Sequence, residues 1–219
     1  MSDADRRPIA SRQTGWARSL SLRLVAAHVS PNAISATSML GALIAGAAFA
    51  ALAWPHEAIT RSLLCLLAIT GMQFRLVCNL LDGMVALAGG RTPSRTGELW
   101  NDLPDRVSDT LILIGAGVAL SQHPWGRDLG YLAALLAAMT AYVRQLGRAQ
   151  GTPACFAGPM AKQHRMAVMT CAAAAEAISV HWACVGWPIA AGLAIVCLGS
   201  TVTCLRRLRL VSKALRGTP

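Results

Sequence analysis

Long uncharged apolar runs are the feature of this sequence that most restricts its fold. No Asp, Glu, Lys or Arg occurs between Glu176 and Arg206. A membrane-spanning helix needs only about 20 residues, so this run is too long for one span and predicts a helical hairpin. Hydrophobic residues make up 54% of the chain and its mean hydropathy is +0.47, which is more apolar than a soluble domain.

Six segments are long enough for transmembrane helices when short polar turns are allowed inside them. They are residues 33–54, 60–84, 97–121, 129–147, 165–182 and 188–206. Before them, Trp16, Leu20 and Leu24 recur every four residues with arginines between, which predicts an interfacial amphipathic helix over 14–29. The predicted fold class is therefore an all-α integral membrane protein.

The domain organisation follows from these segments. We expect a single six-helix membrane domain over 14–206, between a polar N-terminal tail (1–13) and a basic C-terminal tail (207–219). Most Lys and Arg residues fall at the two ends of the chain and after the second and fourth spans, while the opposite side holds only Arg61 and Arg127. The positive-inside rule then predicts a multi-pass protein of the cell membrane with both termini in the cytoplasm.

The net charge of +10 indicates contact with anionic membrane lipids. Nucleic acid is not an expected partner, because aromatic residues make up only 5% of the chain and do not alternate with basic ones.

Acidic residues are concentrated where the second predicted span meets the third. Five of the ten in the chain lie between Asp82 and Asp109. Asn79 and Asp82 share a helix face, and on the next helix a stripe with a spacing of four follows. That stripe consists of Gly97, Asn101, Asp105 and Asp109. Two facing stripes of oxygen ligands predict a site for a hard divalent cation such as Mg²⁺ or Mn²⁺.

The same positions resemble the motif of the CDP-alcohol phosphotransferase family, D-x-x-D-G-x-x-A-R followed by a loop and G-x-x-x-D-x-x-x-D. The identical positions are Asp82, Gly83, Ala86, Gly97 and Asp105. Three positions differ: Asn79 and Asn101 replace Asp, and Leu87 replaces Arg. The resemblance in fold covers nearly the whole chain, whereas the catalytic resemblance is partial.

This resemblance implies a membrane enzyme of phospholipid synthesis. Such an enzyme transfers a phosphatidyl group from a CDP-alcohol, commonly CDP-diacylglycerol (CDP-DAG), to an acceptor hydroxyl and releases CMP. It implies that Asp105 is the catalytic base and that Asp82 and Asp105 bind the metal, with Asn79 and Asn101 as amide ligands. Asn is a weaker oxygen ligand than Asp, so the predicted Mg²⁺ or Mn²⁺ site is weakened.

The resemblance further implies a nucleotide pocket lined by Gly83, Ala86 and Gly97, an active site that faces the cytoplasm, and a homodimer.

A basic cluster completes the predicted site. Arg144 and Arg148 end the fourth span, while Lys162 and Arg165 begin the fifth. Together they are predicted to bind a phosphate of the donor or of a phosphorylated acceptor alcohol. The alternative is that they only anchor the protein by the positive-inside rule.

Two other functions stay open beside the transferase. One is a catalytically silent relative that binds a CDP-lipid or regulates a partner. The other is a small transporter with an intramembrane acidic site, although such sites are expected near the bilayer midplane. A structural role is also open, in which Arg75 and Arg106 neutralise the acidic cluster. Glu176, a lone acid in the fifth span, either pairs with a polar neighbour or lines the cavity.

Overall fold

The computed structural model describes residues 14–55, 57–89, 97–179 and 184–217. These residues form seven α-helices and no strand, so the all-helical fold class is confirmed for this part of the chain. The helices are α1 (Gly15–Ala26), α2 (Pro31–Ala51), α3 (Ala58–Ala88), α4 (Gly97–Ala119), α5 (Gly126–Ala149), α6 (Lys162–Ser179) and α7 (Trp187–Arg216).

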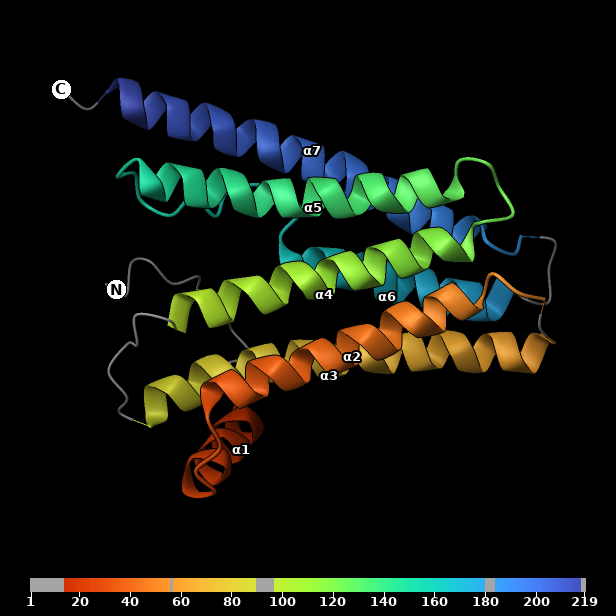
Figure 1. Ribbon diagram of the computed structural model, residues 1–219, viewed down its shortest axis with the longest axis horizontal. Helices are drawn as coiled ribbons and strands as arrows, with labels where there is room; N and C mark the ends of the chain where they lie inside the picture. The colour runs from red at the N-terminus through yellow and green to blue at the C-terminus, as the bar shows by residue number, and fades with distance from the viewer. Residues whose placement is uncertain (1–13, 56, 90–96, 180–183, 218–219) are drawn as a thin grey trace.

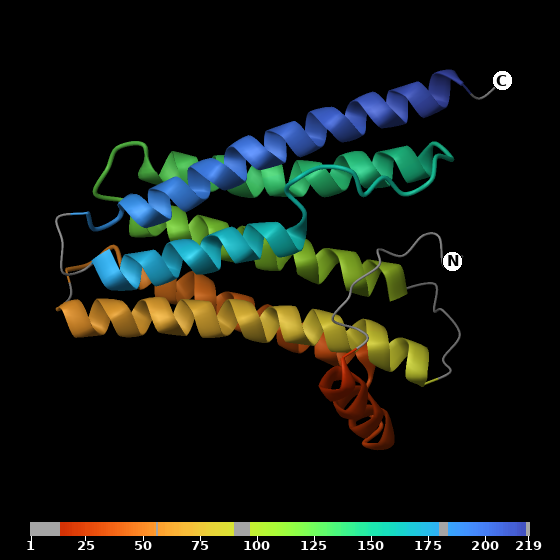
Figure 2. The ribbon, with the colours of Figure 1, turned by 180° about the vertical axis from the view of Figure 1, so that it is seen from behind.

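Helices α2 to α7 form one elongated bundle in which successive helices run in opposite directions (Figure 1). The last turns of α3, α5 and α7 and the first turn of α4 lie at the same end of this bundle (Figures 1 and 2). Near that end α1 leaves the bundle at a steep angle and contacts α3. On α1, Leu24 packs toward the bundle, whereas Trp16 and Leu20 are exposed.

Four helices, α2, α3, α5 and α7, are long and apolar enough to cross a membrane. The shorter or more polar α4 and α6 carry buried charges at Asp105, Asp109, Arg165 and Glu176, and α3 and α7 carry others at Arg75, Asp82 and Arg207. The count of six spans therefore stays a prediction. Helix α7 continues to Arg216, so the segment predicted as a C-terminal tail from residue 207 begins as helix.

At the far end of the bundle, Glu176 is fully buried and joins three elements. Its carboxylate accepts a hydrogen bond from Arg61 of α3 at 2.9 Å and from the backbone N–H of Gly186, which precedes α7, at 2.9 Å. Gly186 has a φ of +86°, a conformation that glycine adopts without strain. The lone acid of the fifth predicted span thus has a polar neighbour, one of the two expected outcomes.

Small residues allow α2 and α4 to pack closely. A Cβ atom placed on Gly46 of α2 would lie 2.5 Å from the carbonyl oxygen of Leu111 on α4, and one on Gly115 of α4 would collide with the backbone of Gly46. Close backbone approach through glycine is a common way to pack helices in membranes.

We expect Gly46→Ala to destabilise the purified protein by about 1–3 kcal/mol, because the added methyl group overpacks a backbone contact that has no flexible side chain to move. The measurement is the thermal unfolding temperature in detergent. Gly15→Ala is the matched control, because nothing lies within 4 Å of the position its Cβ would take. Equal unfolding temperatures for the two variants would contradict this account of α2–α4 packing.

Candidate active site

The site begins with an irregular segment that brings α6 into the middle of the bundle. Residues 150–161 follow α5 and fold back along the bundle, so α6 starts well inside it (Figure 2). The segment is fastened to α7, because Thr203 accepts a hydrogen bond from the N–H of Met160 and Arg207 donates one to the carbonyl of Ala157, each at 2.9 Å. The first turn of α6 therefore faces α4 rather than water.

Asp109 lies at the centre of a buried group of charges. Its two carboxylate oxygens accept from Arg75 Nη2 of α3 at 2.7 Å and from Arg165 Nη2 of α6 at 2.5 Å. All three side chains are at most 3% exposed. Arg165 also donates to the carbonyl of Met160 at 3.1 Å. These contacts join α3, α4 and α6. Because the Arg165 guanidinium is buried and bonded to other groups of the protein, it is not presented to a ligand.

One turn earlier on α4, Asp105 is surrounded by cationic groups. Lys162 Nζ lies 2.8 Å and 2.7 Å from its two carboxylate oxygens. Arg75 Nη2 lies 3.6 Å from one oxygen and Arg106 Nη2 lies 3.9 Å from the other. The Asp105 side chain is 9% exposed, and that of Lys162 is 24% exposed. The ammonium is thus at the edge of the site, in reach of a ligand.

Asp82 on α3 completes this centre. It accepts a hydrogen bond from Ser35 Oγ of α2 at 2.7 Å and is close enough to Lys162 and Asp105 to interact with both electrostatically. One turn before Asp82, the Nδ2 atom of Asn79 is buried and has no hydrogen-bond partner among the described residues. Gly83 and Ala86 follow on α3 and are half-buried.

A partly exposed ion pair borders the centre on α4 and α5. Arg144 Nη2 donates to both oxygens of Asp102 at 2.8 Å and 3.0 Å, and Gln145 donates to the same carboxylate. The guanidinium of Arg144 also lies over the ring of Phe156, 5.6 Å from its centroid. Arg148 is one turn further along α5 and half-buried. The structure therefore brings Asp82, Asp105 and Lys162 together, with Arg144 beside them. Gly97 and Asn101 contribute backbone to α4, and the Asn101 side chain lies outside the described part of the chain.

The described side chains do not fit a divalent metal ion as they are arranged. They contain no group of three His, Cys, Asp or Glu residues that is able to hold one. Both oxygens of Asp105 are occupied by the Lys162 ammonium. Four carboxylates and five cationic side chains form the ion pairs and hydrogen bonds around the centre, so positive charge is already in excess without a metal. They are Asp82, Asp102, Asp105 and Asp109 with Arg75, Arg106, Arg144, Lys162 and Arg165.

Solved structures with the same architecture come from phosphatidylinositol phosphate synthase of Mycobacterium tuberculosis. Its complex with CDP-DAG superposes with a TM-score of 0.70 at 17% identity, covering 89% of this chain and 92% of that chain. Its complex with manganese and citrate gives a TM-score of 0.72 at 17% identity, over 90% and 88%. Its apo form gives 0.70 at 17% identity, over 88% and 94%.

The chain has the fold of phosphatidylinositol phosphate synthase. The fold implied by the motif resemblance is thereby confirmed. No protein-family model and no curated protein sequence matches the chain. At 17% identity the structural likeness establishes the fold and not the reaction.

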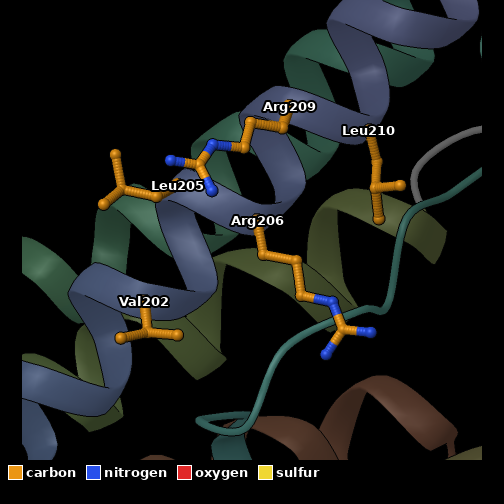
Figure 3. A pocket seen from close by; sticks show the side chains of 5 residues that line it. All are labelled: Val202, Leu205, Arg206, Arg209 and Leu210. Carbon is orange, nitrogen blue, oxygen red and sulfur yellow. The ribbon is translucent and has the colours of Figure 1, made fainter.

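A surface hollow lies along the outer side of α7 (Figure 3). It is lined by Val202, Leu205, Arg206, Arg209 and Leu210. In the close-up the guanidinium groups of Arg206 and Arg209 extend in different directions from the helix (Figure 3). Its lining contains no carboxylate. Arginines among leucines suit a lipid headgroup and its chains.

Two contacts of the site escape prediction from the sequence. Arg75 had been considered as a neutralising partner, and it does bind Asp109 and approach Asp105. By contrast, nothing in the sequence pairs Ser35 with Asp82 or Lys162 with Asp105, because each pair is far apart along the chain. The only available signal was that Lys162 and Arg165 start a predicted span and therefore lie close to the level of the acids.

We expect Asp109→Asn to destabilise the protein by about 3–5 kcal/mol, because it leaves two buried guanidinium groups without their counter-charge. The matched control is Asp102→Asn, since the Asp102 side chain is 27% exposed; we expect it to cost about 1 kcal/mol or less. Unfolding temperatures in detergent report both. A smaller effect at Asp109 than at Asp102 would show that the buried group does not stabilise the fold.

Proposed function

We propose that this protein is a membrane phosphatidyltransferase of phospholipid synthesis. It transfers the phospho-alcohol group of a CDP-alcohol, in our proposal CDP-DAG, to the hydroxyl of a small or phosphorylated alcohol and releases CMP. The observation that carries the proposal is the meeting of Asp82 and Asp105, with the motif spacing, inside a fold shared over nine tenths of the chain with phosphatidylinositol phosphate synthase, one structure of which holds CDP-DAG.

The proposed reaction exchanges one bond at phosphorus and requires of the site a proton acceptor and cationic groups that stabilise the phosphates. The acceptor oxygen attacks the phosphorus that carries the diacylglycerol, the bond from that phosphorus to the oxygen of CMP breaks, and CMP leaves with the bonding electrons. The hydroxyl proton moves to a carboxylate, for which we assign Asp105 because it matches the motif position of the base and lies at the centre of the site. Charge on the phosphates is stabilised by fixed cationic groups, foremost Lys162 and Arg144.

The Lys162–Asp105 contact also favours a second candidate. An ammonium that contacts both carboxylate oxygens competes with an acceptor hydroxyl for Asp105. The protein would then bind a CDP-alcohol without turning it over. Binding and CMP release, measured on the same sample, separate the two candidates.

The remaining parts of the proposal concern the setting of the site. We propose six membrane spans, an interfacial α1 and a homodimer in the cell membrane, with both termini and the nucleotide pocket at Gly83, Ala86 and Gly97 facing the cytoplasm. The gathering of basic residues at the end of the bundle where α7 ends supports this orientation. The predicted Mg²⁺ or Mn²⁺ remains a prediction, opposed by the excess of cationic side chains in the site.

We expect purified protein in lipid to release CMP from CDP-DAG with one member of a panel of alcohols and phosphorylated alcohols, assayed both with Mg²⁺ or Mn²⁺ and with chelator. Asp105→Asn should reduce the rate by about 100- to 10,000-fold, the usual contribution of a positioned base. Asp128→Asn, an exposed acid in the first turn of α5 at the other end of the bundle, is the control and should keep the full rate.

A normal rate in Asp105→Asn would remove that residue from the role of base. Absence of CMP under every condition, while CDP-DAG still binds, would favour the silent relative. Absence of both binding and CMP release would refute the proposed donor.

The orientation has its own test. A green fluorescent protein fused after Pro219 should fluoresce, whereas a periplasmic alkaline phosphatase fused there should be inactive, because the positive-inside rule puts this end in the cytoplasm. Fusions in the turn between α2 and α3 should give the opposite pattern. The same pattern at both positions would contradict the proposed topology.

A further inference from the structure

The position of Lys162 carries an inference beyond the reaction class. We propose that its ammonium takes the place of a divalent cation at Asp105, so that the protein binds the phosphates of its CDP-alcohol ligand without a metal ion. The part of this inference that concerns metal is independent of the reaction, while the part that concerns the ligand rests on the proposed function.

The first support is geometric. Lys162 Nζ lies within 2.8 Å of both oxygens of Asp105, which with Asp82 forms the carboxylate pair that the motif resemblance assigns to the metal. A metal ion bridging these two carboxylates would have to displace this ammonium. Displacement is opposed by the fastening of the preceding segment to α7 through Thr203 and Arg207, which fixes where α6 begins.

The second support is the balance of charge. The motif that the sequence resembles has Asp at both positions that hold Asn79 and Asn101 here. Two such exchanges remove two negative charges, which is the charge that one divalent cation would neutralise. The described centre already holds more cationic than anionic side chains, so a further ion of charge +2 would meet repulsion that nothing described offsets.

The third support is the kind of group that the exchange introduces. A carboxylate only accepts hydrogen bonds, whereas an Asn amide also donates. Asn79 Nδ2 is buried and has no acceptor among the described residues. Such an N–H donor can bind a phosphate or carbonyl oxygen of a ligand, and it cannot coordinate a cation.

The accessibility of Lys162 completes the argument. Arg75 and Arg165 are buried against Asp109 and are committed to the fold. The Lys162 side chain is 24% exposed, and its four-carbon stem lets the ammonium turn from Asp105 toward a phosphate. Arg106 is equally exposed but lies 3.9 Å from Asp105, so Lys162 is the accessible cationic group that contacts this carboxylate directly.

The metal is tested first, with Mn²⁺ itself as the probe and its electron paramagnetic resonance signal as the readout. We expect the purified protein to bind Mn²⁺ at least about tenfold more weakly than the triple variant Asn79→Asp, Asn101→Asp, Lys162→Gln, which restores the acidic ligands and removes the ammonium. Equally tight binding by the unaltered protein would overturn the proposal, and this measurement needs no reaction to occur.

The ligand is tested by CDP-DAG binding in chelator and in Mg²⁺. We expect the same affinity in both, and a loss of about tenfold or more for Lys162→Gln in chelator, as expected for a hydrogen bond between charged groups. Lys162→Arg keeps the charge and should retain most of the affinity. Lys213→Gln, at the chain's other lysine and exposed near the end of α7, is the matched control.

Loss of CDP-DAG binding in chelator would overturn the proposal, as would full affinity of Lys162→Gln. Unfolding temperatures of the variants show whether a loss of affinity comes from misfolding. If Lys162→Gln misfolds, the affinity of Lys162→Arg tests the role of the positive charge instead. If no form of the protein binds CDP-DAG, the proposed function fails. The Mn²⁺ titration then still decides whether Lys162 replaces a metal.

Discussion

The buried ion pairs of Asp109 with Arg75 and Arg165 are the interaction on which the site depends. Isolated buried charges are costly, so two buried guanidinium groups require a carboxylate between them. By joining α3, α4 and α6, Asp109 fixes where α6 begins, and with it the position of Lys162 beside Asp105. The fold and the chemistry of the site therefore share one electrostatic centre.

This centre also explains how the helices differ in composition. Helices α2, α3 and α7 are apolar enough to cross a membrane. They expose large apolar side chains such as Leu40, Leu63 and Leu198. The helices α4 and α6 carry buried charges that are satisfied by one another and by neighbouring helices. Their sequences read as less apolar because their polar groups face the inside of the bundle and not lipid.

The sequence predicted the local features well, because they follow from periodicity and composition. The spans 33–54 and 60–84 correspond to α2 and α3, and α4 begins at Gly97 as expected. The polar partners could not be predicted, since Ser35 and Asp82, or Lys162 and Asp105, meet only through the packing of the whole bundle. In particular, no periodic pattern in the sequence of residues 150–161 predicts that this segment folds back along the bundle. That fold nevertheless places Lys162 beside Asp105.

A lysine in place of a metal ion changes what the site is able to do. A divalent ion carries twice the charge and polarises a phosphate more strongly, but it must be bound from solution. An ammonium is always present and is already held in position by Asp105, so no binding step precedes the arrival of the ligand. Its single charge stabilises less of the charge that develops on phosphate oxygens. In our proposal such a site is better at recognising a CDP-alcohol than at driving fast transfer, and Arg144, beside it on α5, is the second cation proposed for the phosphate of the departing CMP.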